Sequence, residues 1–340
     1  MYGSYTTSIY KLTLYNYLLA IADVQQANVK PTGCKKLEIA KLKLPNVRDA
    51  SCRFLLPSED ANTLYFVDPA SNTLNRANLQ NELAVDVIYH CESPSILCAA
   101  LFIEFAPQQK ALLLTERLPN AANKSMMTHS LSVALFIASQ WTCNQPRVLL
   151  ETATCKLDNR YSVSIGAVHT NKVLCGVYKA SELEALAIDK AGTAQRLKPV
   201  PLGFAHFGFA TGRSENTELL IISLIKWPEL RLLQVMDGES LNLQLLRVIA
   251  VSASSLLWKT AAGLLFIASG NYKPEDSHEV NVFQVSDSGR RIESSGTLIA
   301  HSENLRISCW STVGEKIAIY DNNIKNILMY SYELKNKVQT

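Results

Sequence analysis

The chain has 340 residues, of which 48% are hydrophobic and 19% are charged, and its formal net charge is +3 at pH 7. This is the composition of a globular protein with a large core, and it excludes a chain that is disordered throughout. So small a net charge gives no general attraction to nucleic acid or to an acidic membrane surface. Partners must therefore be inferred from the arrangement of the residues.

The eight cysteines form no CxxC pair and no Cys/His cluster with metal-ligand spacing, so we expect reduced thiols, several of them in the core. The N-terminal stretch MYGSYTTSIYKLTLY lacks the features of a secretory signal peptide. No segment approaches the roughly 20 consecutive apolar residues that span a bilayer. These observations predict an intracellular protein, cytoplasmic or nuclear, with no membrane contact.

Seven short, almost wholly apolar runs recur along the chain, and each is typical of a strand buried on both faces. The steps between the first residues of successive runs are 46, 47, 62, 46, 45 and 52 residues. A period in the forties that is made of short strands indicates a β-propeller, in which each blade is one four-stranded sheet. The runs occupy residues 18–23, 64–68, 111–116, 173–178, 219–224, 264–269 and 316–321.

We therefore predict an all-β fold, a seven-bladed β-propeller of four-stranded antiparallel blades that forms a single domain over residues 1–340. The last unit supplies only three strands, so we expect the segment before Ile9 to supply the fourth. The two chain ends would then close the ring and remove its unpaired edges. The expected blades cover residues 9–46, 47–92, 93–157, 158–203, 204–250, 251–300, and 301–340 together with 1–8.

Two segments need separate interpretation. The 62-residue step contains LSVALFIAS, residues 131–139, whose pattern fits either a short helix or an extra strand. Lysines alternate with Leu and Ile over residues 35–48, which we interpret as the outermost strand of the first blade, where lysine discourages edge-to-edge pairing. Because no aromatic residue lies among these lysines, a nucleic-acid site is not favoured there.

Two segments carry a resemblance to known propellers. TLYFVDPASNTLNRANL, residues 63–79, resembles the strand, turn and strand of YWTD-type and gluconolactonase-like blades. KIAIYDNNIKNILMYSYEL, residues 316–334, is similar to these blades and to the end of a WD-repeat unit, with Tyr320 and Asp321 in place of Trp and Asp. The resemblance is to a divergent WD-repeat-like β-propeller. It implies an interaction scaffold or, as in the lactonase-like propellers, a hydrolase with a central divalent cation.

The carboxylates Asp68, Glu116 and Asp321 come at the ends of comparable runs, so they are the candidate ligands of such a cation. An Asp at a strand end also has a simpler role, because it accepts hydrogen bonds from the amides of a turn. No GxSxG, Walker or GxGxxG motif is present, and we expect His169 and His206 to be hydrogen-bonded core residues. We assign no catalytic residue, cofactor or metal.

In a propeller, the loops between second and third strands emerge on the same face as the links between blades, and loops on a rigid scaffold carry function. In the expected blades 3 to 6 these loops are LPNAANKSMMTH, KASELE, KWPE and NYKPEDSHE. An exposed Trp at a turn tip is a common binding hot spot. We expect a non-enzymatic subunit of a larger complex that binds other protein subunits or a peptide segment; nucleic acid is the less favoured partner, and no small-molecule substrate is evident. The candidate contact residues are Trp227, Pro228, Tyr272, Lys273, Met126 and Met127.

Overall fold

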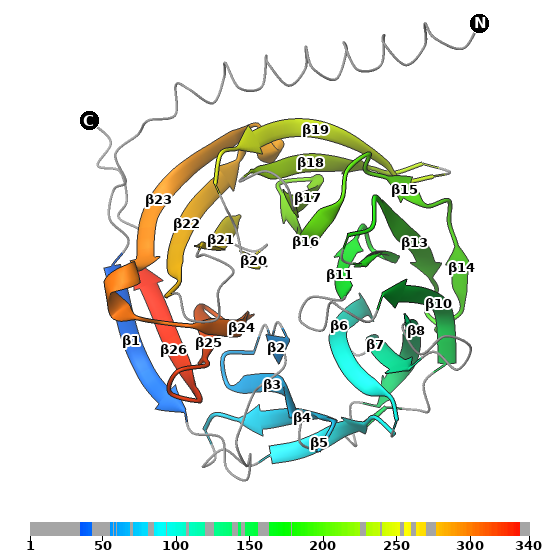
Figure 1. Ribbon diagram of the computed structural model, residues 1–340, viewed down its shortest axis with the longest axis horizontal. Helices are drawn as coiled ribbons and strands as arrows, with labels where there is room; N and C mark the ends of the chain where they lie inside the picture. The colour runs from blue at the N-terminus through cyan, green and yellow to red at the C-terminus, as the bar shows by residue number, and fades with distance from the viewer. Residues whose placement is uncertain are drawn as a thin grey trace, which may run out of the picture.

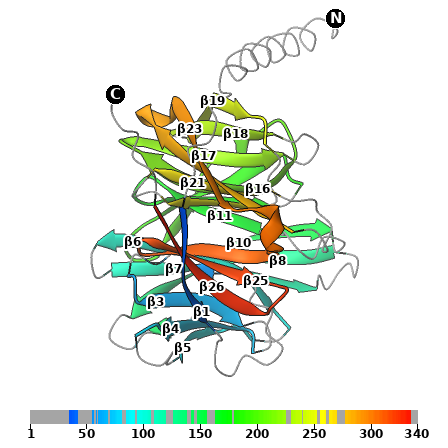
Figure 2. The ribbon, with the colours of Figure 1, turned by 90° about the vertical axis from the view of Figure 1, so that its left-hand side faces the viewer.

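The computed structural model of the chain is built almost wholly of β-strands, which form six antiparallel sheets around a common axis in the described part of the chain (Figure 1). Figure 2 views the same arrangement from the side that carries β1 (Lys35–Leu42) and β26 (Asn326–Glu333). No helix in the described ranges is long and apolar enough to cross a membrane. The structure describes residues 35–42, 55–56, 58, 60–68, 71–80, 85–92, 94–106, 109–119, 126–137, 142–143, 147–155, 163–177, 179–224, 229–238, 240–251, 255–259, 263–269 and 277–333.

The first three sheets follow each other along the chain, and each begins with its innermost strand. The first sheet contains β2 (Leu55–Leu56), β3 (Thr63–Asp68), β4 (Thr73–Asn78) and β5 (Val85–His90). The second contains β6 (Ile96–Ala106), β7 (Gln109–Pro119), β8 (Met126–Ile137), the short β9 (Thr142–Cys143) and β10 (Arg147–Cys155). The third contains β11 (Val163–Val168), β12 (Lys172–Val177), β13 (Glu182–Ile188), β14 (Ala194–Arg196) and the short β15 (Val200–Pro201).

The last three sheets repeat this order. The fourth contains β16 (His206–Ser214), β17 (Thr217–Leu224), β18 (Leu230–Met236) and β19 (Asn242–Ile249). The fifth contains β20 (Ser255–Lys259), β21 (Leu264–Ser269), β22 (Glu279–Ser286) and β23 (Arg291–Ile299), with the 3-10 turns η2 (Asp287–Gly289) inside it and η3 (His301–Glu303) after it. The sixth contains β24 (Ile307–Val313), β25 (Lys316–Asp321), β26 and, from the other end of the chain, β1.

The recurring apolar runs form the second strands β3, β7, β12, β17, β21 and β25. Their burial explains their composition, because a strand with neighbouring sheets on both faces has no solvent-facing positions. In β17, for example, Leu220, Ile221 and Ile222 are fully buried. The third strand β18 is also packed on both faces, with Leu230 and Leu232 in one core and Leu233 and Val235 in the next. The prediction of an all-β propeller with antiparallel four-stranded blades is therefore confirmed.

The predicted number of seven blades is wrong, because the described residues form six sheets. Residues 35–42, which we interpreted as the outer strand of a first blade over residues 9–46, instead form β1 and pair with β26, from Lys35 opposite Glu333 to Leu42 opposite Ile327. β1 thus takes the place that we expected for residues 1–8. Those residues and the run at 18–23 lie outside the described ranges.

The interpretation of the third expected blade also needs correction. Most of residues 118–130, expected as a loop, belongs to two long paired strands, since β7 extends to Pro119 and β8 begins at Met126. The alternative left open for residues 131–139 is decided in favour of a strand over Leu131–Ile137, which lies within β8. Pro119, which suggested a loop, instead pairs with Met127 as the last residue of β7.

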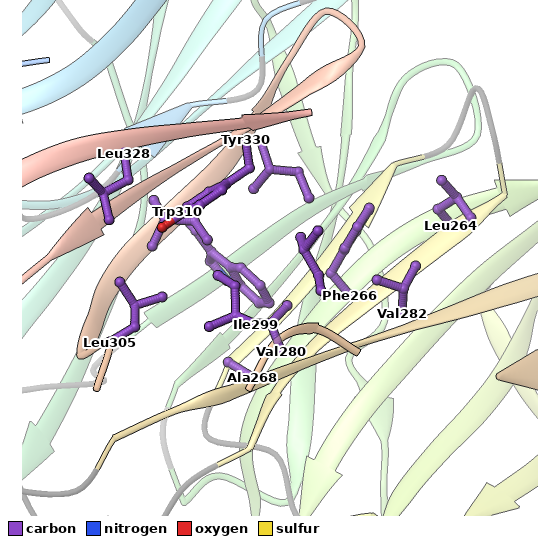
Figure 3. Packing of buried hydrophobic residues seen from close by; sticks show 13 residues of the cluster. Leu264, Phe266, Ala268, Val280, Val282, Ile299, Leu305, Trp310, Leu328 and Tyr330 are labelled. Atoms are coloured by element: carbon purple, nitrogen blue, oxygen red, sulfur yellow. The ribbon is translucent and has the colours of Figure 1, made fainter. Parts of the chain in front are cut away.

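Separate apolar cores fill the spaces between neighbouring sheets. Between the fifth and sixth sheets, Trp310 and Tyr330 pack with Phe266 (Figure 3). The rings of Phe266 and Tyr332 also meet edge-on, with their centres 5.3 Å apart. Trp310 is only 6% exposed. Burial of each large side chain of this kind contributes about 2 to 3 kcal/mol. The six sheets are thus held to each other by side-chain packing between their faces.

The third and fourth sheets approach most closely at glycines on their innermost strands. A Cβ atom on Gly166 of β11 would lie 2.4 Å from the side chain of Thr211 on β16, and one on Gly208 of β16 would lie 3.3 Å from Ser164 Oγ. Only the missing side chains allow β11 and β16 to pack at this distance. These positions therefore fix the spacing between two neighbouring sheets.

Candidate interaction surface

One face of the ring carries both the turns between second and third strands and the links between sheets. We call this the loop face and define it by the described turns 71–72, 179–181 and 322–325 and the described link residues 91–92, 94–95, 197–205 and 300–306. Hydrogen bonds join turns to links at three places around the ring, in the first, third and sixth sheets. The expectation that these two sets of loops share a face is therefore confirmed for the described residues.

In the first sheet, Asn72 holds the link to the second sheet. Its Nδ2 donates to the backbone oxygens of Cys91 at 2.9 Å and Ser95 at 2.8 Å, and its Oδ1 accepts from the Leu97 amide at 3.1 Å. Its backbone oxygen also accepts from the Cys91 amide at 3.0 Å. Asn72 has φ of 56°, a left-handed conformation that Asn tolerates better than most residues. One side chain therefore fixes the path of the chain between two sheets.

In the third sheet, His206 joins the turn 179–181 to the start of β16. The Nδ1 of His206 donates to the backbone oxygen of Ala180 at 2.8 Å, and the Lys179 amide donates to the His206 oxygen at 3.1 Å. The side chain of His206 is fully buried, as we predicted for a core histidine. Burial lowers the pKa of His206, while the bond to Ala180 acts in the opposite direction.

In the sixth sheet, the carboxylate of Asp321 binds both the turn and the link of the loop face. Its Oδ1 accepts from the amides of Arg306, in the link, at 3.1 Å and of Asn323, in the turn, at 2.9 Å. The Nδ2 of Asn323 donates to the backbone oxygen of Asn304 at 2.6 Å. His278 completes the link, because its Nδ1 accepts from the Ile307 amide at 3.1 Å. Polar side chains thus lock this part of the face as well.

The three candidate cation ligands have local hydrogen-bond partners. Asp68 accepts from the hydroxyl of Ser71 at 2.7 Å, and Glu116 accepts from the hydroxyl of Tyr89 at 2.5 Å. The contacts of Asp68 and Asp321 fit the simpler role of stabilising turns at strand ends, whereas Glu116 lies within β7 and joins it to Tyr89 of β5 in the first sheet. Among the described residues, no group of three or more His, Cys, Asp or Glu side chains is placed to hold a metal ion.

Tyr89, Cys91 and Glu116 lie together where the first and second sheets meet, and of these three only Cys91 is fully buried. Burial raises the pKa of Tyr89, and the Glu116 carboxylate that accepts its hydrogen bond adds to the effect. Burial, with Glu116 again contributing, raises the pKa of Cys91 to about 12. Both groups therefore stay neutral at physiological pH, and the Cys91 thiol lacks the low pKa of a nucleophilic cysteine.

The described part of the chain includes two of the six predicted contact residues. Met126 and Met127 are the first two residues of β8, where Met127 lies opposite Pro119 of β7. Trp227, Pro228, Tyr272 and Lys273 lie outside the described residues. Partner binding by these six residues stays a prediction.

Ile324 is 46% exposed in the turn 322–325 of the loop face. A single exposed apolar residue is normal on a protein surface, so Ile324 serves only to mark a position on this face. The other exposed large apolar residues of the described chain belong to β5, β10, β18 and β19, on the outer part of the ring: Val85, Val87, Val148, Met236 and Leu245.

No family model matches the sequence, and no curated protein matches it either. Solved structures do share its fold. A glucose dehydrogenase is 10% identical with a TM-score of 0.57, and the match covers 87% of this chain and 99% of that one. The soluble aldose sugar dehydrogenase of Escherichia coli is 9% identical with a TM-score of 0.56, covering 89% and 100%. The WD40 domain of Toxoplasma gondii coronin is 12% identical with a TM-score of 0.53, covering 92% and 89%.

These neighbours include both enzymes and WD40 domains, and at about 10% identity they show the fold alone. The recurring strands, the six antiparallel sheets and the likeness to WD40 domains agree with each other. The chain is a β-propeller, and its fold is shared with WD40 domains and with sugar dehydrogenases.

Proposed function

We propose that this protein is a non-enzymatic interaction scaffold, a subunit of a larger intracellular complex that binds other protein subunits or a peptide segment through its loop face. The observation that carries the proposal is the use of polar side chains on this face. Asn72, His206 and Asp321 all bind backbone groups of turns and links, so they build a fixed platform. A rigid frame under exposed loops is the usual arrangement of binding surfaces.

A hydrolase with a central cation is the alternative from another class. It needs carboxylates from several sheets that converge on one point with free oxygen atoms. Asp68 and Asp321 instead turn oxygens back onto neighbouring hydroxyl and amide groups, and Glu116 accepts from Tyr89. This use of their oxygens favours the scaffold.

An intracellular location, in the cytoplasm or the nucleus, is part of the proposal. Four of the described cysteines are free thiols, and three of these four are buried. Proteins that are secreted more often pair such cysteines in disulfides. The free thiols of Cys91, Cys98, Cys175 and Cys309 fit a reducing compartment.

The experiment is affinity capture from cells that express the protein, with two matched variants. Ile324→Asp places a charge on the loop face, whereas Val148→Asp places the same charge on β10 of the outer ring, at a residue that is 55% exposed. We expect Ile324→Asp to lose partners that the wild-type chain and Val148→Asp both retain. Loss of partners with Val148→Asp alone contradicts the proposal, and so does turnover of a lactone or sugar by the purified chain.

We also propose that β1 closes the ring. β1 fills the outer position of the sixth sheet, and Ser58, just after β2, bonds to β24 of that sheet, with the Ser58 amide donating to the Thr312 oxygen at 3.0 Å. A chain that lacks residues 1–42 should melt at a lower temperature and self-associate through the exposed edge of β26. Removal of residues 1–34 is the control, since it leaves β1 intact. Equal behaviour of the two truncated chains contradicts closure by β1.

A further inference from the structure

The imidazole of His206 occupies a site that suits only its neutral form. Its side chain is fully buried, and because Nδ1 donates to the Ala180 oxygen at 2.8 Å, Nδ1 carries the proton and Nε2 holds a lone pair. Nε2 is buried and has no hydrogen-bond partner in the described structure. A second proton on the ring would therefore add a buried N–H that lacks an acceptor.

The surroundings of Nε2 are apolar. Gly176 of β12 lies close to the ring, because a Cβ atom added to it would be 2.6 Å from Nε2. The side chains of Leu183 and Phe209 would each be 2.8 Å from that added Cβ atom. The rings of His206 and Phe209 have their centres 6.3 Å apart. Three strands, β12, β13 and β16, thus surround the ring with one bare backbone position and two hydrocarbon side chains.

Charged groups on these elements are paired or exposed. Glu184 of β13 binds Arg196 at 2.8 Å, and Arg213 of β16 lies 3.4 Å from Glu218. Lys172 of β12 binds Asp237, and the thiol of Cys175 stays neutral because burial raises its pKa to about 12. The remaining charged groups, Lys179 of the turn and Glu182 at the start of β13, are exposed. None of these groups is arranged to compensate a charge on His206.

We propose that His206 is a proton-operated clasp of the loop face, which mild acid opens by driving the charged imidazole out of its apolar site. This inference rests on the proposed function only for its consequence, the loss of a partner. Opening breaks the Nδ1 bond to Ala180 and frees the paired backbone bonds, the Lys179 amide to the His206 oxygen and the His206 amide to the Ala180 oxygen. The turn 179–181 then separates from the start of β16, while the bond from the Leu202 amide to the Ser181 oxygen at 2.8 Å still joins the turn to the link.

Amide hydrogen exchange of the free, full-length chain tests the clasp between about pH 8 and about pH 5. Exchange rates are first corrected for the intrinsic pH dependence of exchange. As the pH then falls from the pKa of His206 in the unfolded chain towards its lower pKa in the fold, the Lys179 and His206 amides should exchange up to about tenfold faster for each pH unit. The Cys91 amide, bonded to Asn72 on the same face, should stay unchanged. Equal acceleration at all three amides indicates global loosening and overturns the proposal.

His206→Asn provides the matched variant, because its amide nitrogen can take the place of Nδ1 as donor to Ala180 but gains no proton in this range. His90→Asn, at an exposed histidine of β5, is the control. We expect the acid-induced exchange to persist in His90→Asn and to vanish in His206→Asn; its persistence in His206→Asn overturns the proposal. If His206→Asn does not fold, an NMR titration of the imidazole nitrogens in the wild-type chain still tests the proposal. It must show one histidine that is protonated at Nδ1 and that titrates below pH 6.5.

Partner capture separates this inference from the proposed function. If the scaffold proposal holds, a partner bound at about pH 8 should be released at about pH 5 from the wild-type chain but kept by His206→Asn. Acid-induced exchange without any captured partner sustains the clasp and contradicts the scaffold. A captured partner whose binding ignores both pH and the variant sustains the scaffold and contradicts the clasp.

Discussion

Replacing Asn72 with alanine should destabilise the whole propeller, because a single side chain holds the link between the first and second sheets. The variant loses three hydrogen bonds, to the backbone oxygens of Cys91 and Ser95 and from the Leu97 amide. It also leaves alanine in a left-handed backbone conformation with φ of 56°. Both losses act on the same turn.

The magnitude follows from these two losses. Each hydrogen bond contributes about 1 kcal/mol net, so removal of three costs about 3 kcal/mol, and the left-handed conformation adds roughly 1 kcal/mol for alanine. Asn72→Gly separates the two, since glycine loses the same bonds but adopts a positive φ without strain. We therefore expect losses of about 4 kcal/mol for Asn72→Ala and about 3 kcal/mol for Asn72→Gly.

Urea unfolding gives the free energies from the shift of the midpoint at constant slope. Asn78→Ala is the control, since the Asn78 side chain accepts one exposed bond, from the Gln80 amide at 2.9 Å. Its loss should stay near 1 kcal/mol. If Asn72→Ala costs no more than Asn78→Ala, the link is held by other contacts and the reasoning fails.

Three further predictions concern contacts between sheets. Gly166→Ala should cost about 1 to 3 kcal/mol by forcing β11 from Thr211 on β16, and Thr211→Ala should relieve part of this loss in a double-mutant cycle followed by thermal melting; strictly additive losses contradict the contact. Trp310→Ala should cost about 3 to 5 kcal/mol in urea unfolding, and a loss below about 1 kcal/mol would mean that the tryptophan is not a core residue. The hydrogen bond from Lys172 lowers the pKa of Asp237, so its stabilisation is present above the unfolded-state pKa and is lost as the pH falls. Lys172→Met should raise that pKa in a carboxylate titration by NMR and cost less than about 1 kcal/mol, since Asp237 is half exposed; an unchanged titration refutes the ion pair.

The strand positions were predictable because burial on both faces demands a particular composition. Six of the seven apolar runs form second strands, which neighbouring sheets cover on both faces. The number of blades was not predictable in the same way. The rhythm of residues 35–42 indicates a strand but not its partner, and that partner, β26, lies at the other end of the chain.

The site was less accessible to sequence reasoning. His206 was expected in the core, and Asp321 was expected at a turn, because strand position determines both roles. Asn72 gave no such signal, since its partners are backbone groups 19 and 23 residues away that any sequence offers. Contacts of a side chain with distant main chain therefore cannot be predicted from residue type alone.

The pairing of β1 with β26 bears on how the protein is made. Lys35 leaves the ribosome long before Glu333, the residue that lies opposite it. The sixth sheet therefore stays incomplete until β26 has been synthesised, and β1 has no partner strand during that time. Joining segments so distant along the chain is slow, so the nascent protein should depend on chaperones until β26 emerges.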